Sequence, residues 1–264
     1  MADGDYERGR GRELAHLQAR LREFARARRA ASAPRVFTLN GWAASPRAWD
    51  LCTYPRRVPG VRLFSYVDQL DGRVAAAFAE DPEAKIVLVG WSMGGGTALG
   101  LARRFPQRLA GLVLLAATPR MMADPATGWV GMSEHRLNAL RKGLELTHGE
   151  GFFGVPDGKP NPYMVDTPEN LERGLGFLLA SDVRADLVRV FTATPATFPV
   201  YIFQSARDGI VRPENAAFLQ TVFPRAHVTM VPGAEHALPI QIPQEIDDAV
   251  DACLAVAAPR EDPR

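Results

Sequence analysis

Cysteine is scarce in this chain of 264 residues, which contains only Cys52 and Cys253. Two cysteines are too few for a disulfide framework, and no Cys-x-x-Cys or Cys/His spacing typical of a zinc site surrounds them. We therefore expect no structural disulfide and no bound metal. The same scarcity favours a reducing, cytoplasmic environment.

Long hydrophobic runs and an excess of one charge are also missing. The longest apolar runs, such as 112–117, are far shorter than the roughly 20 residues that cross a bilayer. The charged beginning of the chain lacks the apolar core of a secretion signal. Lysine and arginine number 31 against 30 acidic residues, so there is no global field to attract an anionic polymer. We expect no transmembrane segment and no nucleic-acid partner.

Residues 1–33 differ in composition from the rest of the chain, with eight arginines and five acidic residues among the first 30. Leu14, Leu17, Leu21 and Phe24 recur at three- and four-residue spacing, which predicts an amphipathic helical arm. Its apolar stripe needs a partner, either its own domain or a second copy of the chain through self-association. A basic helix that contacts another protein or a membrane surface is the alternative.

Short apolar runs alternate with helical segments from Pro34 onward. The runs expected to form strands are 35–39, 61–66, 86–89, 112–116, 200–204 and 228–231. Helical patterns at 72–79 and 95–104 lie between them. This alternation predicts an α/β fold with a mostly parallel central sheet and helices on both faces. Ligands of such sheets bind beyond the carboxyl ends of the strands.

The alternation breaks between residues 119 and 194. Segments 133–146 and 168–179 have helical patterns, the stretch between them is rich in turn residues, and no strong strand pattern occurs. We interpret 119–194 as a helical cap inserted before the strand at 200–204. The segments 34–118 and 195–264 then form the α/β core.

The strongest motif is Gly90-Trp91-Ser92-Met93-Gly94, between a predicted strand and a predicted helix. A serine on such a sharp turn has an exposed hydroxyl, and the small flanking residues allow the strained backbone that the turn requires. The following helix directs its free amides toward the serine. A glycine-rich turn with an incidental serine is the alternative, whereas a phosphate loop is excluded because no Lys-Ser/Thr pair follows.

A serine nucleophile needs a base, and the base needs a group that fixes its tautomer. Of the five histidines, only His236 falls on a loop after a strand at the expected carboxyl edge. Asp208 follows the strand at 200–204 and is the candidate acid. A solvated loop histidine and a turn-forming aspartate are the structural alternatives. The order Ser92, Asp208, His236 is that of hydrolases with a nucleophile elbow.

An oxyanion site would use the backbone amide of Met93, directly after the nucleophile, and that of Trp42 in the loop after the first strand. Gly41 would let this loop approach the serine. Each such donor is worth roughly 3 kcal/mol of transition-state stabilisation. Trp42 and Trp91 are either core aromatics or walls of an acyl-binding pocket.

These motifs resemble the α/β-hydrolase superfamily over roughly residues 35–257, with GWSMG as elbow, ARDGIV as acid loop and GAEHA as histidine loop. Within the superfamily the chain is similar to the pimeloyl-[acyl-carrier protein] methyl ester esterases of biotin synthesis. The segments NGWAASPRAW, AATPRM, GLGFLLASDVRADL and HALPIQIPQEI carry this similarity. Asn40 differs, because such enzymes usually have histidine at this position.

The resemblance implies a cofactor-independent serine carboxylesterase that works through an acyl-enzyme. Ser92 would be the nucleophile, His236 the base and Asp208 the orienting acid, while Trp42 and Met93 would provide the oxyanion amides. Trp42, Met93 and Trp91 would also contact the substrate.

The substrate implied by the resemblance is the methyl ester of a pimeloyl group on acyl-carrier protein, an acidic partner. Basic residues of the cap are the candidates for docking it: Arg136, Arg141, Lys142 and Arg173. A solvated helix face is the alternative for these four residues.

Two other functions are compatible with the sequence. One is a hydrolase or acyltransferase that acts on other small esters, lactones or thioesters. The other is a non-catalytic ligand-sensing protein that keeps the fold. An intact set of catalytic residues favours catalysis, since a receptor needs no activated nucleophile.

Overall fold

The computed structural model describes residue 20 and residues 34–147, 158–163 and 166–257. The chain divides into two units, Met1–Ala33 and Pro34–Arg264. Apart from Arg20, the predicted amphipathic arm lies outside the described residues, and the fold below is that of the second unit.

A six-stranded sheet forms the centre of this unit, in the order β2-β1-β3-β4-β5-β6, and every neighbouring pair is parallel. The strands are β1 (Arg35–Leu39), β2 (Arg62–Phe64), β3 (Ile86–Trp91), β4 (Leu109–Leu115), β5 (Val200–Ser205) and β6 (His227–Val231). The predicted α/β fold with a parallel sheet is confirmed. The strand expected at 112–116 begins at Leu109, where a register shift in β3 lets Leu109 and Gly111 pair with Ile86 and Val87.

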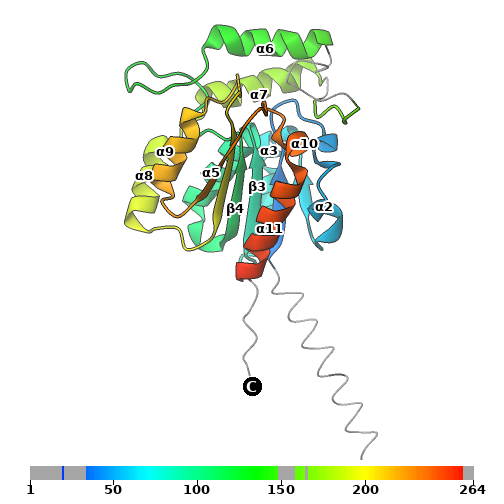
Figure 1. Cartoon of the computed structure of the whole chain (residues 1–264), viewed down its shortest axis with the longest axis vertical. Helices are drawn as coiled ribbons and strands as arrows, with labels where there is room; N and C mark the ends of the chain where they lie inside the picture. The colour runs from blue at the N-terminus through cyan, green and yellow to red at the C-terminus, as the bar shows by residue number, and fades with distance from the viewer. Residues whose placement is uncertain (1–19, 21–33, 148–157, 164–165, 258–264) are drawn as a thin grey trace, which may run out of the picture. The chain divides into compact units, whose positions relative to one another are not determined.

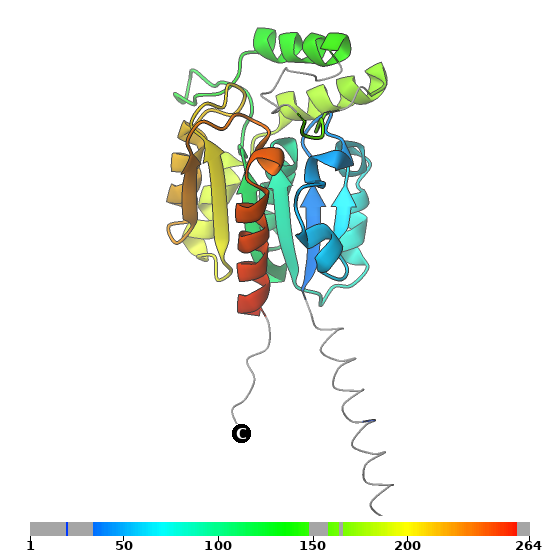
Figure 2. The ribbon, with the colours of Figure 1, turned by 45° about the vertical axis from the view of Figure 1, so that its right-hand side comes forward.

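Helices cover both faces of the sheet (Figures 1 and 2). The longer helices of the core are α4 (Arg73–Ala79), α5 (Met93–Arg104), α8 (Arg184–Ala193), α9 (Glu214–Val222) and α11 (Pro243–Ala257). Shorter turns of helix are η1 (Pro46–Trp49), α2 (Tyr54–Arg57), α3 (Tyr66–Leu70), η2 (Pro106–Arg108) and α10 (Leu238–Gln241).

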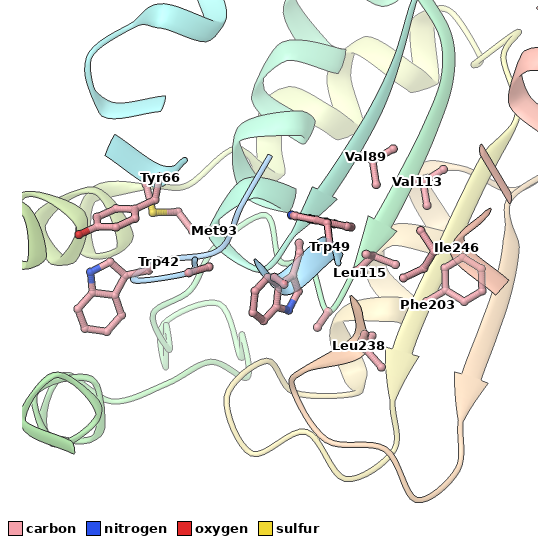
Figure 3. Packing of buried hydrophobic residues seen from close by; sticks show 14 of the residues in the cluster. Trp42, Trp49, Tyr66, Val89, Met93, Val113, Leu115, Phe203, Leu238 and Ile246 are labelled. Carbon is pink, nitrogen blue, oxygen red and sulfur yellow. The ribbon is translucent and has the colours of Figure 1, made fainter. Parts of the chain in front are cut away.

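Alternate residues of the strands enter two separate cores. Val87, Val89 and Val113 pack in one cluster with residues of α11, whereas Leu88 and Leu112 pack in the other with residues of α4, α5, α8 and α9. This division follows from the period of two along a strand. Both clusters consist of buried side chains, so the sheet is a rigid platform for the loops at its edge (Figure 3 shows part of the first cluster).

The segment predicted as a cap contains α6 (Glu134–Thr147), α7 (Pro168–Ala180) and α8. Helices α6 and α7 lie over the carboxyl edge of the sheet (Figures 1 and 2). Helix α8 instead packs against α5 and α9 of the core. Two of the three helices are therefore placed to cover a site at this edge.

Candidate active site

Ser92 lies between the end of β3 and the start of α5, in a backbone conformation with φ 55° and ψ −117°. A positive φ is strained for a residue with a side chain. The Ser92 amide donates to the carbonyl of Leu115 at 2.9 Å, which ties the turn to β4. Neighbouring packing thus holds the serine in a turn that its own preferences disfavour.

Glycines permit this turn because the chain approaches itself closely on both sides. A Cβ atom on Gly90 would lie 2.6 Å from the carbonyl oxygen of Gly94. A Cβ on Gly94 would lie 2.1 Å from the carbonyl oxygen of Leu39, and one on Gly95 would lie 2.4 Å from the Cβ of Ala117. The sequence predicted a need for small residues at 90 and 94, and these distances give the reason.

The structure brings together the three side chains that the sequence separates by up to 144 positions. Nε2 of His236 lies 2.9 Å from Oγ of Ser92, and Nδ1 lies 2.8 Å from Oδ2 of Asp208. An ionised carboxylate only accepts hydrogen bonds, so Nδ1 carries the proton and Nε2 accepts from the serine hydroxyl. The hydroxyl therefore already points its proton at a base.

The acid loop after β5 fixes the Asp208 carboxylate. Its other oxygen, Oδ1, accepts hydrogen bonds from the amides of Ile210 at 2.8 Å and Val211 at 3.0 Å. The Asp208 side chain is fully buried, and that of His236 is 6% exposed. Hydrogen bonds to buried charged groups are stronger than those in water, so the carboxylate holds the imidazole firmly.

Trp91 supports the loop that carries His236. Its indole Nε1 donates to the carbonyl of His236 at 2.9 Å, and the two ring centres are 5.8 Å apart. Trp91 is fully buried and lines neither of the two pockets that border Ser92. The sequence placed Trp91 among the substrate contacts, and the structure places it in the support of the histidine loop.

The two predicted oxyanion donors come from segments on either side of Ser92. Met93 is the first residue of α5, where an amide has no partner within the helix. On the other side, a Cβ on Gly41 would lie 3.2 Å from the Cβ of Ser92. The loop that carries the Trp42 amide therefore runs directly against the serine.

Helix α7 contacts this loop through the Trp42 side chain. Nε1 of Trp42 donates to the carbonyl of Leu171 in α7 at 3.2 Å. A Cβ on Gly174 would lie 2.4 Å from the indole ring. In Figure 3, Trp42 lies close to Tyr66 and Met93. The indole thus connects α7 with the loop beside the serine.

Sequence reasoning missed a polar network that holds the same loop. The side chain of Gln69 donates to the carbonyl of Asn40 at 2.8 Å and accepts from the hydroxyl of Thr97 at 2.8 Å. Asn40, which is buried, accepts a hydrogen bond from the indole of Trp49. Asn40 stands out in the sequence by its departure from the family, but nothing there indicates its partners.

Two narrow, mostly apolar pockets border the Ser92 hydroxyl. One, of about 20 Å³, is lined by Trp42, Tyr163 and by residues of α6 and α7, including Leu137 and Leu178. The other pocket has a volume of about 10 Å³, and its lining includes Met93 of α5 and Phe177 of α7. Each has room for about one water molecule.

The four candidate docking residues have different surroundings. Arg141 of α6 forms an ion pair with Glu172 of α7, and Arg173 pairs with Asp71 at 2.5 Å. Arg136 and Lys142 are exposed on α6. Two of the four therefore link α6 and α7 to each other or to the core, and the other two remain on the surface.

Two further features of the described residues bear on function. They contain no group of three or more histidine, cysteine, aspartate or glutamate side chains placed to hold a metal ion. None of the helices in these ranges is long and apolar enough to cross a membrane.

The parallel sheet, the strained serine and the Ser-His-Asp arrangement define the α/β-hydrolase fold class. The chain belongs to the family described as serine aminopeptidase, S33, whose model matches residues 40–241. The family match shows that the chain is a serine hydrolase.

One similar protein is a pimeloyl-[acyl-carrier protein] methyl ester esterase from Nitrosomonas europaea. It is 26% identical over 252 residues, which cover 83% of this chain and 95% of the relative.

Solved structures share the fold. A bromoperoxidase from Bacillus anthracis superposes with a TM-score of 0.65 at 18% identity, over 85% of this chain and 92% of the other. A thermophilic esterase from Thermogutta terrifontis has a TM-score of 0.61 at 18% identity, over 86% and 92% of the two chains.

Proposed function

We propose that Ser92 is the nucleophile of an esterase, that His236 is its general base and acid, and that Asp208 orients the histidine. The observation that supports these roles is the unbroken chain of hydrogen bonds from Asp208 through His236 to Ser92, at 2.8 and 2.9 Å. These distances allow direct proton transfer.

In the first half of the reaction, Oγ of Ser92 attacks the ester carbonyl carbon while Nε2 of His236 takes the hydroxyl proton. The resulting oxyanion accepts hydrogen bonds from the amides of Met93 and Trp42. His236 then gives its proton to the alcohol oxygen, the C–O bond breaks, and an acyl-serine remains.

In the second half, His236 removes a proton from a water molecule as that water attacks the acyl-serine. Collapse of the second tetrahedral intermediate releases the carboxylic acid and returns the proton to Ser92. Every proton passes through His236, so the cycle calls for no cofactor.

The substrate we propose is the methyl ester of a pimeloyl group on acyl-carrier protein, with the acid and methanol as products. This follows the name of the similar protein from Nitrosomonas europaea. The apolar lining at Ser92 agrees with an acyl chain and a small alcohol. Residues 119–194 would act as the cap, and exposed Arg136 and Lys142 would meet the acidic carrier more readily than Arg141 and Arg173.

The roles of the three residues are tested by Ser92→Ala and Asp208→Asn with a short chromogenic ester. We expect the first to lower kcat on the order of 10⁴-fold or more and the second on the order of 10³- to 10⁴-fold, because the imidazole loses its tautomer control. The melting temperature should change little in the serine variant. Retained turnover in Ser92→Ala would reject the assignment.

The substrate is tested by supplying the gene to a biotin auxotroph that lacks its methyl esterase. We expect growth with the wild-type gene and none with Ser92→Ala. Lack of growth with both, although the protein is produced and hydrolyses the chromogenic ester, would reject this substrate while leaving the esterase assignment intact.

A further inference from the structure

A groove of about 510 Å³ adjoins the narrow pocket over Ser92. Leu140 of α6, Ile210 of the acid loop and His236 line both spaces. The groove is therefore continuous with the edge of the imidazole. A substrate whose ester lies at Ser92 would extend its other end into this groove.

Two arginines from different parts of the fold line the groove, Arg136 of α6 and Arg207 of the acid loop. Both are exposed. Among the described residues, neither has a carboxylate oxygen within 4.0 Å, whereas Arg141, Arg173 and Arg184 each form an ion pair.

The guanidinium of Arg136 lies directly against the acid loop. A Cβ on Gly209 would be 3.0 Å from its Nη2 atom, so the glycine next to Asp208 leaves space for this charge. Glu235 contributes the single carboxylate among the residues that line the groove. The two arginines and this one carboxylate give the lining a net charge of +1 when His236 is counted as neutral.

We propose that Arg136 and Arg207 form an anion subsite for a carboxylate or phosphate at the far end of the substrate. The inference rests on the proposed esterase function. Guanidinium groups bind both anions through paired N–H donors. Because the groove adjoins an apolar pocket, it fits an amphiphilic ester with an uncharged reacting end and an anionic distal end.

The test compares esters that differ only in distal charge. Monomethyl and dimethyl pimelate form the carboxylate pair. The phosphopantetheine and pantetheine thioesters of monomethyl pimelate form the phosphate pair. For each pair, the measured quantity is the ratio of kcat/KM for the anionic ester to that for the neutral ester.

We expect Arg136→Gln and Arg207→Gln each to lower this ratio about three- to tenfold, mainly through KM, for whichever pair carries the recognised anion. Arg207→Lys should restore part of it because the charge returns. The matched control is Arg225→Gln, which removes an exposed arginine just before β6, at the opposite edge of the parallel sheet.

An unchanged ratio in both pairs would overturn the subsite, and so would an equal loss on anionic and neutral esters, which would report a disturbed Asp208. If the wild type hydrolyses none of these esters, the proposed function fails separately. The subsite is then measured by calorimetric binding of pimelate and of phosphopantetheine to Ser92→Ala protein. We expect Arg136→Gln or Arg207→Gln, added to Ser92→Ala, to weaken the binding of pimelate, of phosphopantetheine or of both. Unchanged binding of both ligands would overturn the subsite.

Discussion

The serine turn and helices α6 and α7 meet at Ser92, but different forces hold them. The turn is fixed by backbone atoms in close contact, such as Gly94 against Leu39, within a buried core. Helices α6 and α7 are linked to each other and to the core partly by half-exposed ion pairs, including Arg141–Glu172 and Arg173–Asp71. Backbone packing tolerates almost no change, whereas exposed ion pairs are weak and adjustable.

This difference separates the two tasks of the site. The proposed chemistry depends on distances near 3 Å between Ser92, His236 and Asp208, and the rigid core supplies them. In the proposed reaction, entry of an acyl chain depends on movement of side chains of α6 and α7, because each of the two narrow pockets described at Ser92 has room for about one water molecule. Substitutions in the two regions should therefore affect different quantities.

The largest effect is expected from Gly94→Ala. The new methyl would lie 2.1 Å from a backbone oxygen, and backbone cannot rotate away as a side chain can. We expect about 3 kcal/mol or more of lost stability together with lost esterase activity. Urea denaturation and ester hydrolysis measure both.

Gly100→Ala in the same helix is the control, because apart from its chain neighbours and the adjacent backbone of its own helix no atom lies within 4 Å of the new methyl. It should stabilise by up to about 1 kcal/mol. Equal effects of the two substitutions would show that close packing does not fix the turn.

The next largest effect is expected from Gly174→Ala in α7, where the methyl would meet the Trp42 indole at 2.4 Å. Displacement of the Trp42 side chain would also move the backbone amide of Trp42, which is one of the two proposed oxyanion donors. We expect kcat/KM to fall about tenfold, with about 1–2 kcal/mol of lost stability. Gly176→Ala, with open space around its methyl, should leave kcat/KM unchanged. A similar loss in both variants would contradict a specific role for the Trp42 contact.

A smaller, pH-dependent effect is expected from Asp182, which follows α7. The hydrogen bond from Arg184, with further help from Arg120, lowers the pKa of Asp182 below its ordinary value. Between the pKa of the folded protein and that of the unfolded chain, Asp182 is therefore still charged in the folded protein but protonated in the unfolded chain. This stabilisation is fully present above the unfolded pKa of about 3.9 and is lost as the pH falls below it.

Asp182→Asn should accordingly cost about 1 kcal/mol at pH 7, after allowance for solvent screening, and progressively less below about pH 4. Denaturation midpoints across this pH range measure the difference. Asp248→Asn is the comparison, since this exposed carboxylate accepts a hydrogen bond from uncharged Gln244. A cost that grows as the pH falls would have the wrong sign for this account.

The smallest effect is expected from Arg173→Gln, which breaks the exposed ion pair with Asp71. Such exposed pairs contribute little to stability and weaken in salt. We expect a change in KM of about two- to threefold that disappears in high salt, with kcat retained. A large loss of kcat would mean that the cap positions the catalytic groups directly.

Local patterns in the sequence were sufficient for the strands and for the segments that carry the site. The run 35–39 matches β1, and the helix expected at 168–179 matches α7 to within one residue. Helices α9 and α11 were not predicted. The strand order was not predicted either, because pairing of β1 with β3 depends on contacts between distant segments.

The supporting contacts of the site were beyond sequence reasoning for the same reason. No motif marks Gln69, and the segment GLGFLLASDVRADL, which begins at Gly174, does not indicate what this glycine contacts. The importance of both residues depends on Asn40 and Trp42, which lie far away in the chain. The placement of Trp91 behind His236 likewise depends on which face of β3 the side chain takes. The motifs indicate the candidate reacting groups, whereas the residues that support them are determined by tertiary packing.

The most direct measurement is covalent labelling with an organophosphonate, followed by mass spectrometry of the peptides. An activated serine should give one adduct per chain, on Ser92, and His236→Ala should slow labelling by orders of magnitude. An esterase-active protein that carries the label on another residue, or that labels at an equal rate without the imidazole, would contradict the account.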